Sequence, residues 1–538
     1  MKSRYAPYVA GLLVCSLFIG LGLIFIPYPG AQYDEVLFVS AIYRPDQVEA
    51  TMNLPWLGRV PIMLMTYLGT LKAAIYVPIL KLLWPSHYTL RGPMLLAGAL
   101  SIWLFFLALR RLAGNKAALL ASLLLATDSI YLLTCIFDWG PVALQHLFFT
   151  LTFYLLLRYC SQPRPLWLFL AGLACGLAMW DKALFIWSMA GFGIALTAFL
   201  PKQLWAVARD RRMLGAIVLG FVLGSAPFLF YNARNRGRTF TANTESDEQN
   251  ALTKLGMLDR TMDGIGLMGY LSRDSVEGPA QNMKSWEPLP IRARNLLRAP
   301  RQSWQHLLLV FCLLAAPALC WSSPNRKLTL IVLLGGLLTY LLMISTRRAG
   351  GSAHHTILLW PTFHLLVGLA AGAVFSRWQG RVAKITVALV LGCSLSNLMV
   401  LNTYLADFIE FGPGISWNDA SRALINELGK RTGRMVFCTD WGVLNQMDFY
   451  SRGKIGMHPA SDGMVLGLPD ASNAEQLNLA LSDPKFMFVT MAEGKDLFPN
   501  NRKKFLDFAA AQGYQRHLMF TIRDRHTAPT FEVYEFTR

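Results

Sequence analysis

The chain has 538 residues, of which 54% are hydrophobic and only 15% are charged, and its mean hydropathy is +0.38. This composition lies outside the range of ordinary soluble domains and indicates a membrane protein. The formal net charge of +18 does not indicate a nucleic-acid partner, because the basic residues form short clusters between apolar runs instead of one stripe or tail. The eight cysteines show neither a disulfide pattern nor zinc-ligand spacing.

Apolar runs of membrane-spanning length recur through residues 1–405. The first run, residues 8–27, has no clear small-x-small cleavage site after it, so we expect a retained anchor and not a signal peptide. Further runs follow at residues 90–109, 117–134, 139–157, 165–180, 184–200, 213–230, 304–321, 328–344, 356–375 and 385–405.

Residues 60–84 form a further apolar run, which is ambiguous because it carries Lys72, Lys81, Pro61 and Pro78. The basic clusters decide between a crossing and a non-crossing segment. If the run does not cross, all of the clusters lie in cytoplasmic loops; they are Arg110/Arg111/Lys116, Arg158/Arg164, Lys202/Arg209/Arg211/Arg212, Arg326/Lys327 and Arg377/Arg381/Lys384. The positive-inside tendency therefore predicts an interfacial or re-entrant segment, and with it about eleven spans with a cytoplasmic N-terminus.

On this topology the outer face receives two long loops, at about 28–89 and 231–303, and the C-terminal residues 406–538. The last region has strand-like runs at 435–439 and 485–490 and amphipathic stretches at 421–428 and 502–511. The sequence thus predicts a polytopic α-helical membrane domain, residues 1–405, followed by an extracytoplasmic α/β domain, residues 406–538. We expect the chain to reside in the inner (plasma) membrane.

An acidic pair, Asp34 and Glu35, follows the first span within a few residues, which places two carboxylates at the membrane surface. A hydroxyl acceptor is a poor nucleophile, and a partly desolvated carboxylate of raised pKa can take its proton as attack begins. The alternative is an ordinary solvated acidic loop, since the dipeptide alone is a weak motif.

A further carboxylate, Asp138, lies at the outer junction of the third and fourth expected spans, on the same face as Asp34. It could serve the chemistry, or it could cap the fourth span, since Asp accepts helix N-terminal N–H bonds and Pro141 suits an early helical position. Asp181 and Lys182 occupy another outer turn, where they could be only a local pair.

These features together resemble the GT-C fold. The resemblance rests on the acidic pair after the first span, the membrane-hugging segment, the run Leu90-Arg91-Gly92-Pro93 opening the next span, the basic run at 109–114 closing it, and Asp138. The chain is most similar to the protein O-mannosyltransferases, the aminoarabinose transferases of lipid A and the Rgt-type transferases. The resemblance implies that Asp34 is the catalytic base, with Glu35 beside it and Asp138 as a second carboxylate.

A lipid-phosphate leaving group gains negative charge as the glycosidic bond breaks, so the site needs cations or N–H donors. Our candidates for substrate and phosphate binding are Arg91, Lys182, Arg347, Arg348, His354 and His355. The outer arginines could instead contact anionic lipid headgroups. Adjacent histidines on a helix diverge and rarely bind one metal ion together, so we do not expect His354 and His355 to form a metal site. Metal dependence stays open: Asp34 and Glu35 could hold a divalent cation, but no DxD spacing demands one.

The sequence predicts a membrane glycosyltransferase that moves a sugar from a polyprenyl-phosphate donor to a lipid, glycan or protein acceptor on the periplasmic face, with inversion. Membrane lipids are the other expected partners, and nucleic acid is not expected. Two alternatives remain: an O-antigen ligase or polymerase, and a lipid or polysaccharide transporter (flippase). Transporters usually carry ionisable residues or broken helices near the bilayer midplane, whereas Asp34, Asp138 and Asp181 lie at span ends.

Overall fold

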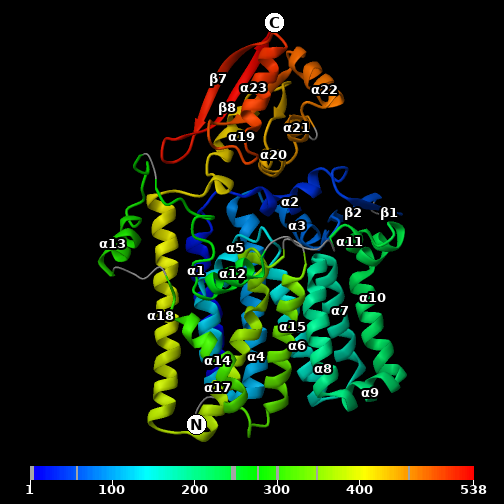
Figure 1. The fold of residues 1–538 in the computed structure, drawn as a ribbon, viewed down its shortest axis with the longest axis vertical. Helices are drawn as coiled ribbons and strands as arrows, with labels where there is room; N and C mark the ends of the chain where they lie inside the picture. The colour runs from blue at the N-terminus through cyan, green and yellow to red at the C-terminus, as the bar shows by residue number, and fades with distance from the viewer. Residues whose placement is uncertain are drawn as a thin grey trace.

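The computed structural model describes residues 5–55, 58–243, 250–275, 278–297, 302–346, 349–458 and 461–538. A bundle of helices makes up most of the molecule, and a β-sheet with its own helices stands at one end of it (Figure 1). The first described residues lie at the opposite end of the bundle (Figure 1). We call the end of the bundle next to this sheet the sheet end.

Each apolar run expected to cross the membrane is helical. The helices of the bundle are α1 (Ala6–Phe25), α4 (His87–Thr127), α5 (Ser129–Ile136), α6 (Ala143–Ser161), α7 (Pro165–Asp181), α8 (Ile186–Phe199), α10 (Arg211–Arg234), α14 (Gln305–Leu319), α15 (Arg326–Ile344), α17 (Trp360–Arg377) and α18 (Arg381–Glu410). The expected spans at 90–109 and 117–134 share α4, which is broken at Gly114, where φ is +83°, and the second of them continues into α5. Because α18 continues to Glu410, the expected boundary after residue 405 lies within a helix.

By length and apolar composition alone, six helices of the described residues could each cross a membrane, or seven if a bent pair counts as one span. That pair is Ala183–Phe199 with α9 (Pro201–Arg209), bent by 103°. Helices α7 and α14 are apolar but shorter. The chain is therefore a membrane protein by composition and structure, and the expected count of about eleven spans requires its shorter helices to cross as well.

The ambiguous run at residues 60–84 does not form one helix. Its first part enters a three-stranded antiparallel sheet of β1 (Ala50–Leu54), β2 (Gly58–Met65) and β3 (Leu68–Gly69), and its second part forms α3 (Leu71–Leu82). A helix of 12 residues rises only about 18 Å, which is too short for a hydrocarbon core of about 30 Å. This structure is compatible with the expected interfacial or re-entrant segment, which stays a prediction.

Short elements fill the connections at the sheet end. The first connection contains α2 (Tyr33–Tyr43) as well as the small sheet and α3; the second contains α11 (Arg238–Thr241), α12 (Ala251–Met262) and α13 (Pro288–Leu297); and α16 (Ala353–Thr356) precedes α17. Three short 3-10 helices, at Ala183–Phe185, Ile357–Leu359 and Ile415–Trp417, complete the connections.

The C-terminal unit, residues 421–538, is an α/β layer structure. Its five-stranded sheet has the order β5-β4-β6-β8-β7, with β4 parallel to β5 and β6, and β8 antiparallel to β6 and β7. The strands are β4 (Met435–Cys438), β5 (Gly456–Met457), β6 (Phe486–Met491), β7 (Gln515–Arg523) and β8 (Pro529–Thr537); the helices are α19 (Ser421–Gly429), α20 (Val443–Ser451), α21 (Ser461–Leu466), α22 (Ala471–Ser482) and α23 (Asn501–Ala511).

Successive side chains of β4 alternate between two hydrophobic cores, as the pleat of a strand requires. Val436 and Cys438 pack on the side of α19 and α20, and Phe437 packs with Phe488 and Phe505 on the side of α21–α23. Both strands and both amphipathic helices expected in this region are present, as β4, β6, α19 and α23. Strands β5, β7 and β8 and the other helices were not predicted.

Small residues let α7 and α10 pack closely within the bundle. Gly172 and Gly176 of α7 face backbone atoms of α10, and Gly220 and Gly224 of α10 face backbone atoms of α7. Such small-xxx-small pairs allow helix backbones to approach closely in a membrane, where water supplies no hydrophobic driving force between helices.

We predict that Gly220→Ala destabilises the bundle, because a Cβ at this position would overlap the carbonyl oxygen of Phe169. Overpacking of this kind costs about 1–3 kcal/mol, which should lower the melting temperature measured in detergent. Gly215→Ala is the matched control on the same helix, since a Cβ there meets no atom within 4 Å. Equal melting temperatures for the two variants would contradict the close packing.

Candidate active site

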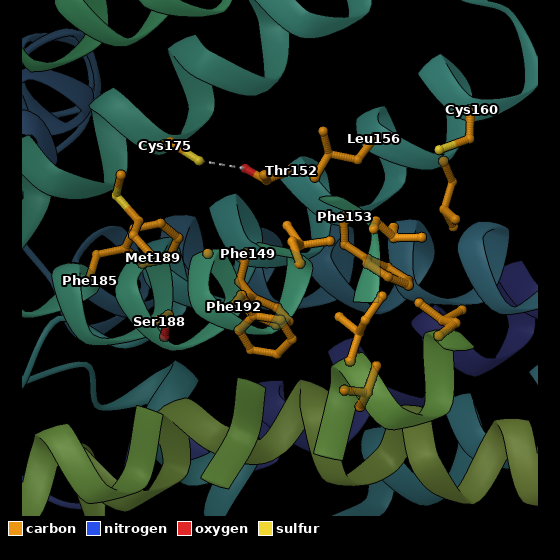
Figure 2. Close-up of a pocket in the computed structure, with 17 residues that line it drawn as sticks. Phe149, Thr152, Phe153, Leu156, Cys160, Cys175, Phe185, Ser188, Met189 and Phe192 are labelled. Atoms are coloured by element: carbon orange, nitrogen blue, oxygen red, sulfur yellow. Dashed lines mark hydrogen bonds between the residues drawn. The ribbon is translucent and has the colours of Figure 1, made fainter. Parts of the chain in front are cut away.

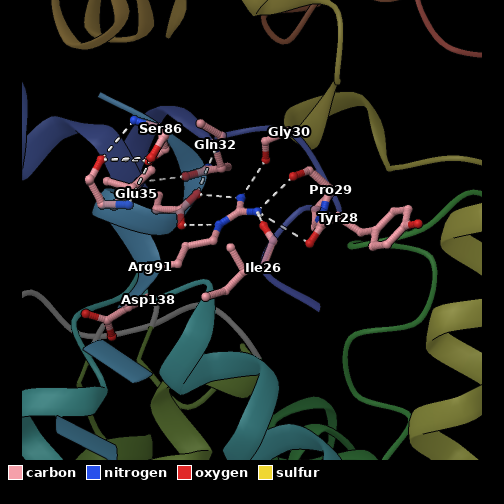
Figure 3. Close-up of polar contacts among 12 residues, drawn as sticks. Ile26, Tyr28, Pro29, Gly30, Gln32, Glu35, Ser86, Arg91 and Asp138 are labelled. Atoms are coloured by element: carbon pink, nitrogen blue, oxygen red, sulfur yellow. Dashed lines mark hydrogen bonds and ion pairs between the residues drawn. The ribbon is translucent and has the colours of Figure 1, made fainter. Parts of the chain in front are cut away.

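Arg91 organises the turn that follows the first helix. Its side chain is fully buried, and its guanidinium donates hydrogen bonds to the carbonyl oxygens of Ile26, Pro29 and Gly30 at 2.7–2.8 Å. It also forms a two-point ion pair with Glu35, with Nε–Oε1 and Nη2–Oε2 distances of 2.7 and 2.9 Å (Figure 3). One side chain of α4 thereby fixes the chain from the end of α1 to the start of α2.

Local capping sets where α2 begins. The Gln32 side chain accepts hydrogen bonds from the N–H groups of Asp34 and Glu35, and the Glu35 carboxylate accepts from the N–H of Gln32 in return. This is a capping box, in which two otherwise unpaired N–H positions are satisfied reciprocally. Because Glu35 is turned inward for this role, Asp34 in the same first turn is left to face the other way.

Helix α2 lies at the sheet end of the bundle (Figure 1), and its Asp34 faces a cavity of about 160 Å³. The cavity is lined by Asp34, Leu37, Phe38, Met65, Tyr67, Leu68, Trp139, Gly140, Pro141, Lys182, Tyr270, His354 and His355. Burial raises the pKa of Asp34 to about 7, although the hydrogen bonding to Gln32 and the charge of Lys182 act in the opposite direction. A carboxyl group tuned to this range is suited to accept a proton near neutral pH.

Lys182 is buried in the same cavity. It follows α7 directly, and its segment is held in place because Ala183 donates its N–H to the carbonyl oxygen of Tyr67 at 3.0 Å. The Lys182 ammonium donates to the carbonyl oxygen of Gly140 at 2.6 Å. Burial lowers the pKa of Lys182 to about 8, while Asp181, Asp138 and Asp34 act to raise it.

The two histidines complete one wall of the cavity. His354 contacts Ser352 through Nδ1, and its ring meets the ring of Trp139 edge to face at 5.6 Å. Gly140 packs against the His354 ring so closely that a Cβ on Gly140 would overlap it. Nδ1 of His355 is buried without a hydrogen-bond partner within the described part of the chain, so it can accept or donate a bond to a ligand.

Asp138 lies behind the cavity and does not line it. Its Oδ1 accepts hydrogen bonds from the N–H groups of Val142 and Ala143 at 2.5 and 3.0 Å, and its Oδ2 pairs with Lys72 at 2.9 Å. Lys72 also donates to the carbonyl oxygen of Asp138 at 2.8 Å. Asp138 thus binds the N–H groups at the start of α6, as the capping interpretation expects. It does not touch the cavity, but it holds in place the residues after it, Trp139, Gly140 and Pro141, which line the cavity.

The structure brings together Asp34, Lys182, His354 and His355 among the residues singled out in the sequence. Glu35 and Arg91 do not line the cavity, because they are buried against each other. We therefore revise both from catalytic or phosphate-binding residues to positioning residues. Arg347 and Arg348 lie outside the described residues. Within the part of the chain that the structure describes, no three His, Cys, Asp or Glu side chains are grouped as metal ligands.

Sequence reasoning missed three groups that matter here: Lys72, Tyr67 and Tyr270. Lys72 was read only as a charge within an ambiguous segment, although it is the partner of Asp138. Tyr67 lies in the turn between β2 and β3, and Tyr270 in the second connection. In Tyr67-Leu68-Gly69 and Gly269-Tyr270 a tyrosine lies within two residues of a glycine, but neither tyrosine could be assigned to the cavity without the fold.

A second, apolar cavity of about 290 Å³ lies within the bundle. Its lining comes mainly from α6 and α8, with contributions from α7 and α15, and includes Phe149, Phe153, Phe185, Met189 and Phe192 (Figure 2). A smaller cavity shares Phe149, Phe185 and Ser188 with it and is also lined by Gln145. Gln145 donates to Asp181, the neighbour of Lys182, at 2.9 Å, so the apolar space extends toward the polar cavity.

Comparisons with known proteins agree with this architecture. The family model of dolichyl-phosphate-mannose-protein mannosyltransferases matches residues 74–231. ArnT from Cupriavidus metallidurans in the apo state is similar in structure, with a TM-score of 0.60, 13% sequence identity, and 99% of this chain and 98% of that chain covered. The same protein bound to undecaprenyl phosphate gives a TM-score of 0.57 at 12% identity, with the same coverage.

The oligosaccharyltransferase of Archaeoglobus fulgidus in the apo form is a more distant structural neighbour, with a TM-score of 0.50 and 11% identity over 97% of this chain and 75% of that chain. No curated protein matches the chain by sequence. The chain has the GT-C fold of membrane glycosyltransferases. The family-model match, which spans residues 74–231, agrees with this fold.

We predict that Arg91→Met strongly destabilises the protein, because it leaves the charge of Glu35 buried without its partner. Breaking a buried ion pair from one side costs about 3–5 kcal/mol, so the melting temperature should fall clearly. The double variant Arg91→Met/Glu35→Met should recover part of this loss, since no unpaired charge remains. Arg292→Met, at an exposed position, is the control; similar melting for Arg91→Met and Arg292→Met would contradict the role of the pair.

Proposed function

We propose that the protein is an integral-membrane glycosyltransferase that transfers a sugar from a polyprenyl-phosphate donor to an acceptor hydroxyl. The observation that carries this proposal is the cavity in which Asp34 faces Lys182, His354 and His355. A base and a group of nitrogen donors at the end of a membrane bundle suit a reaction between a lipid-anchored phosphate and an acceptor at the membrane surface.

In the proposed reaction, Asp34 accepts the proton of the acceptor hydroxyl as its oxygen attacks the anomeric carbon of the donor sugar. The bond from that carbon to the phosphate oxygen breaks, and polyprenyl phosphate leaves with the electron pair, so the anomeric configuration inverts. Lys182 and the histidines stabilise the charge that develops on the phosphate. Positioning in the cavity supplies much of the remaining acceleration.

The apolar cavity is our candidate for part of the lipid tail of the donor. Its lining is almost wholly hydrophobic, from Phe149 near the polar end to Leu200 and Leu328 at the other. The structural neighbour ArnT has been solved with undecaprenyl phosphate, a ligand of the proposed class. The acceptor could be a lipid, a glycan or a protein, since the cavity contacts do not select among them.

We assign the sheet end to the extracytoplasmic (periplasmic) side of the inner (plasma) membrane, with a cytoplasmic N-terminus and about eleven spans. Helix α9, which carries Lys202 and Arg209, lies at the end of the bundle away from the sheet (Figure 1), as the positive-inside tendency requires. The proposed division is a membrane domain of residues 1–405 and an extracytoplasmic domain of residues 406–538, with the connecting helix α18 crossing this boundary.

The transporter alternative would draw support from ionisable groups inside the bundle, and Asp128 is one such group. Its carboxylate accepts hydrogen bonds from the N–H of Tyr131 at 2.8 Å and from the indole of Trp360 at 2.6 Å, and it also contacts Gln305. These partners cap α5 and tie α14 and α17 to it. Asp128 is thus engaged in holding helices together, which favours the transferase over the transporter.

We predict that Asp34→Asn abolishes transfer of radiolabelled sugar from polyprenyl-phosphate donors in membranes that contain the inserted protein. Asn cannot accept the proton, while its size preserves the fold, so the loss should reach about 100-fold or more. Asp46→Asn is the matched control, because Asp46 is an exposed carboxylate that follows α2. Equal transfer by both variants would remove Asp34 from the chemistry, and an EDTA arm tests for a divalent cation.

We also predict a bell-shaped pH dependence of kcat/KM. The rate should rise through about pH 7 as Asp34 loses its proton and should fall above about pH 8 as Lys182 loses its charge. Lys182→Arg keeps the charge at high pH, so this variant should lose the alkaline limb and keep the acidic one. An alkaline limb that is unchanged in Lys182→Arg would show that another group causes it.

A further inference from the structure

The C-terminal unit lies directly against the helix that carries Asp34. Helix α20 packs along α2, on the side of the sheet (Figure 1). The side chain of Gln446 donates to the carbonyl oxygen of Ala31 at 2.7 Å, and Arg44 pairs with Asp448 at 2.7 Å. One contact lies before Asp34 and the other at the far end of α2, so both ends of this short helix are held.

Tyr33, the residue before Asp34, packs against an aromatic side chain of the C-terminal unit. The ring of Tyr33 lies 3.8 Å from the ring of Trp441, measured between centroids, and Trp441 stacks on Phe498 at 5.7 Å. Gly442 has a φ of +89°, and a Cβ there would lie 2.5 Å from the Cβ of Tyr33. The turn at Trp441 and Gly442 is therefore closely fitted to Tyr33.

The β7–β8 hairpin of the same unit holds the second connection. Arg525 receives a hydrogen bond from the N–H of Gln281 at its carbonyl oxygen, at 3.0 Å, and pairs with Glu287 through its side chain. Glu287 also accepts the hydroxyl of Tyr28, which belongs to the turn organised by Arg91. The hairpin thus links the second connection to the turn that leads to Asp34.

Tyr270, the cavity residue of the second connection, is held by the segment that leads into the C-terminal unit. Gly414 donates its N–H to the carbonyl oxygen of Leu271 at 2.8 Å, and Arg273 donates its N–H to the carbonyl oxygen of Gly412 at 3.0 Å. A Cβ on Gly414 would overlap the carbonyl oxygen of Tyr270. Two cavity residues from different connections, Asp34 and Tyr270, therefore depend on the same C-terminal region.

We propose that the C-terminal unit is part of the catalytic unit, and that Trp441 and Gln446 are positioning residues that hold Asp34 against the cavity. Helix α2 has only 11 residues, and an isolated helix of this length is marginal in water. Arg91 and Glu35 fix its start from the membrane side, and the C-terminal unit supplies the packing on the other side. The proposal rests on the proposed function of Asp34 as the base.

The test compares Gln446→Leu and Trp441→Ala with a matched control in the full-length protein. The control is Arg502→Gln, which breaks an ion pair with Glu532 inside the C-terminal unit and does not touch α2. Misplacement of the base by about 1 Å costs up to about 100-fold in rate, so kcat should fall at least tenfold in the two test variants. The donor KM should stay within about twofold, since Lys182 and the apolar cavity are unchanged.

Two further readouts separate positioning from a general loss of stability. Trp441→Phe keeps a ring against Tyr33 and should restore most of kcat. Hydrogen–deuterium exchange of the peptide that contains α2 should be faster in Gln446→Leu and Trp441→Ala than in wild type and Arg502→Gln. This exchange measurement does not depend on activity, so it decides the proposal even if the wild-type protein transfers no sugar, an outcome that would defeat only the proposed function.

The proposal would be overturned if the exchange of α2 were the same in Gln446→Leu, Trp441→Ala and the control. It would also be overturned if both test variants kept the kcat of wild type, or if Arg502→Gln lowered kcat as much as they do. In the last case the C-terminal unit would act through its overall stability and not through its contact with α2.

Discussion

The buried ion pair of Arg91 and Glu35 is the constraint on which the site depends. Two charges taken out of water are costly unless their geometry is good and their remaining hydrogen-bonding positions are filled. Here the guanidinium satisfies this condition by donating to both Glu35 oxygens and to four backbone carbonyl groups. These bonds connect α4 to the end of α1 and to the start of α2. Asp34 lies in the first turn of α2, so they also fix its position.

The two buried lysines near the cavity, Lys72 and Lys182, have different partners. Lys72 neutralises Asp138 behind the wall, which leaves Lys182 as the buried cation that lines the cavity itself within the described residues. Lys182 donates to a carbonyl oxygen, not to a carboxylate, so its charge is not consumed by a close ion pair. A cation held in this way can meet the phosphate of a donor, while Asp34, whose pKa is raised, meets the acceptor proton.

The parts of the structure that local chemistry determines could be predicted from the sequence. The apolar runs are helices, and residues 60–84, which two prolines and two lysines interrupt, do not form one continuous helix. Asp138 accepts hydrogen bonds from the N–H groups at the start of α6, as its place before Pro141 suggests, although the helix itself begins only at Ala143. From the sequence, Asp34, Lys182 and His354 were expected only to lie on the same face of the membrane. That they line one cavity could not be predicted, because the packing of the bundle brings together residues that are far apart in sequence.

Pairings across long sequence distances could not be predicted. The partners Arg91 and Glu35 belong to different helices, and each looked like a site residue because polar groups near a membrane surface suggest function when their partner is unknown. The same holds for the contact of Trp441 with Tyr33, which joins α2 to the C-terminal unit. A single sequence contains no direct signal for such contacts, so roles inferred from position alone had to be revised once the fold was seen.

The most direct test of the central claim is an experimental structure of the protein with polyprenyl phosphate bound. The account predicts that the phosphate lies within hydrogen-bonding distance of the Lys182 ammonium, next to His355 and on the same cavity as Asp34, with the first isoprene units directed toward Phe149 and Phe185. A phosphate bound elsewhere, with this cavity unoccupied, would contradict the assignment of the site.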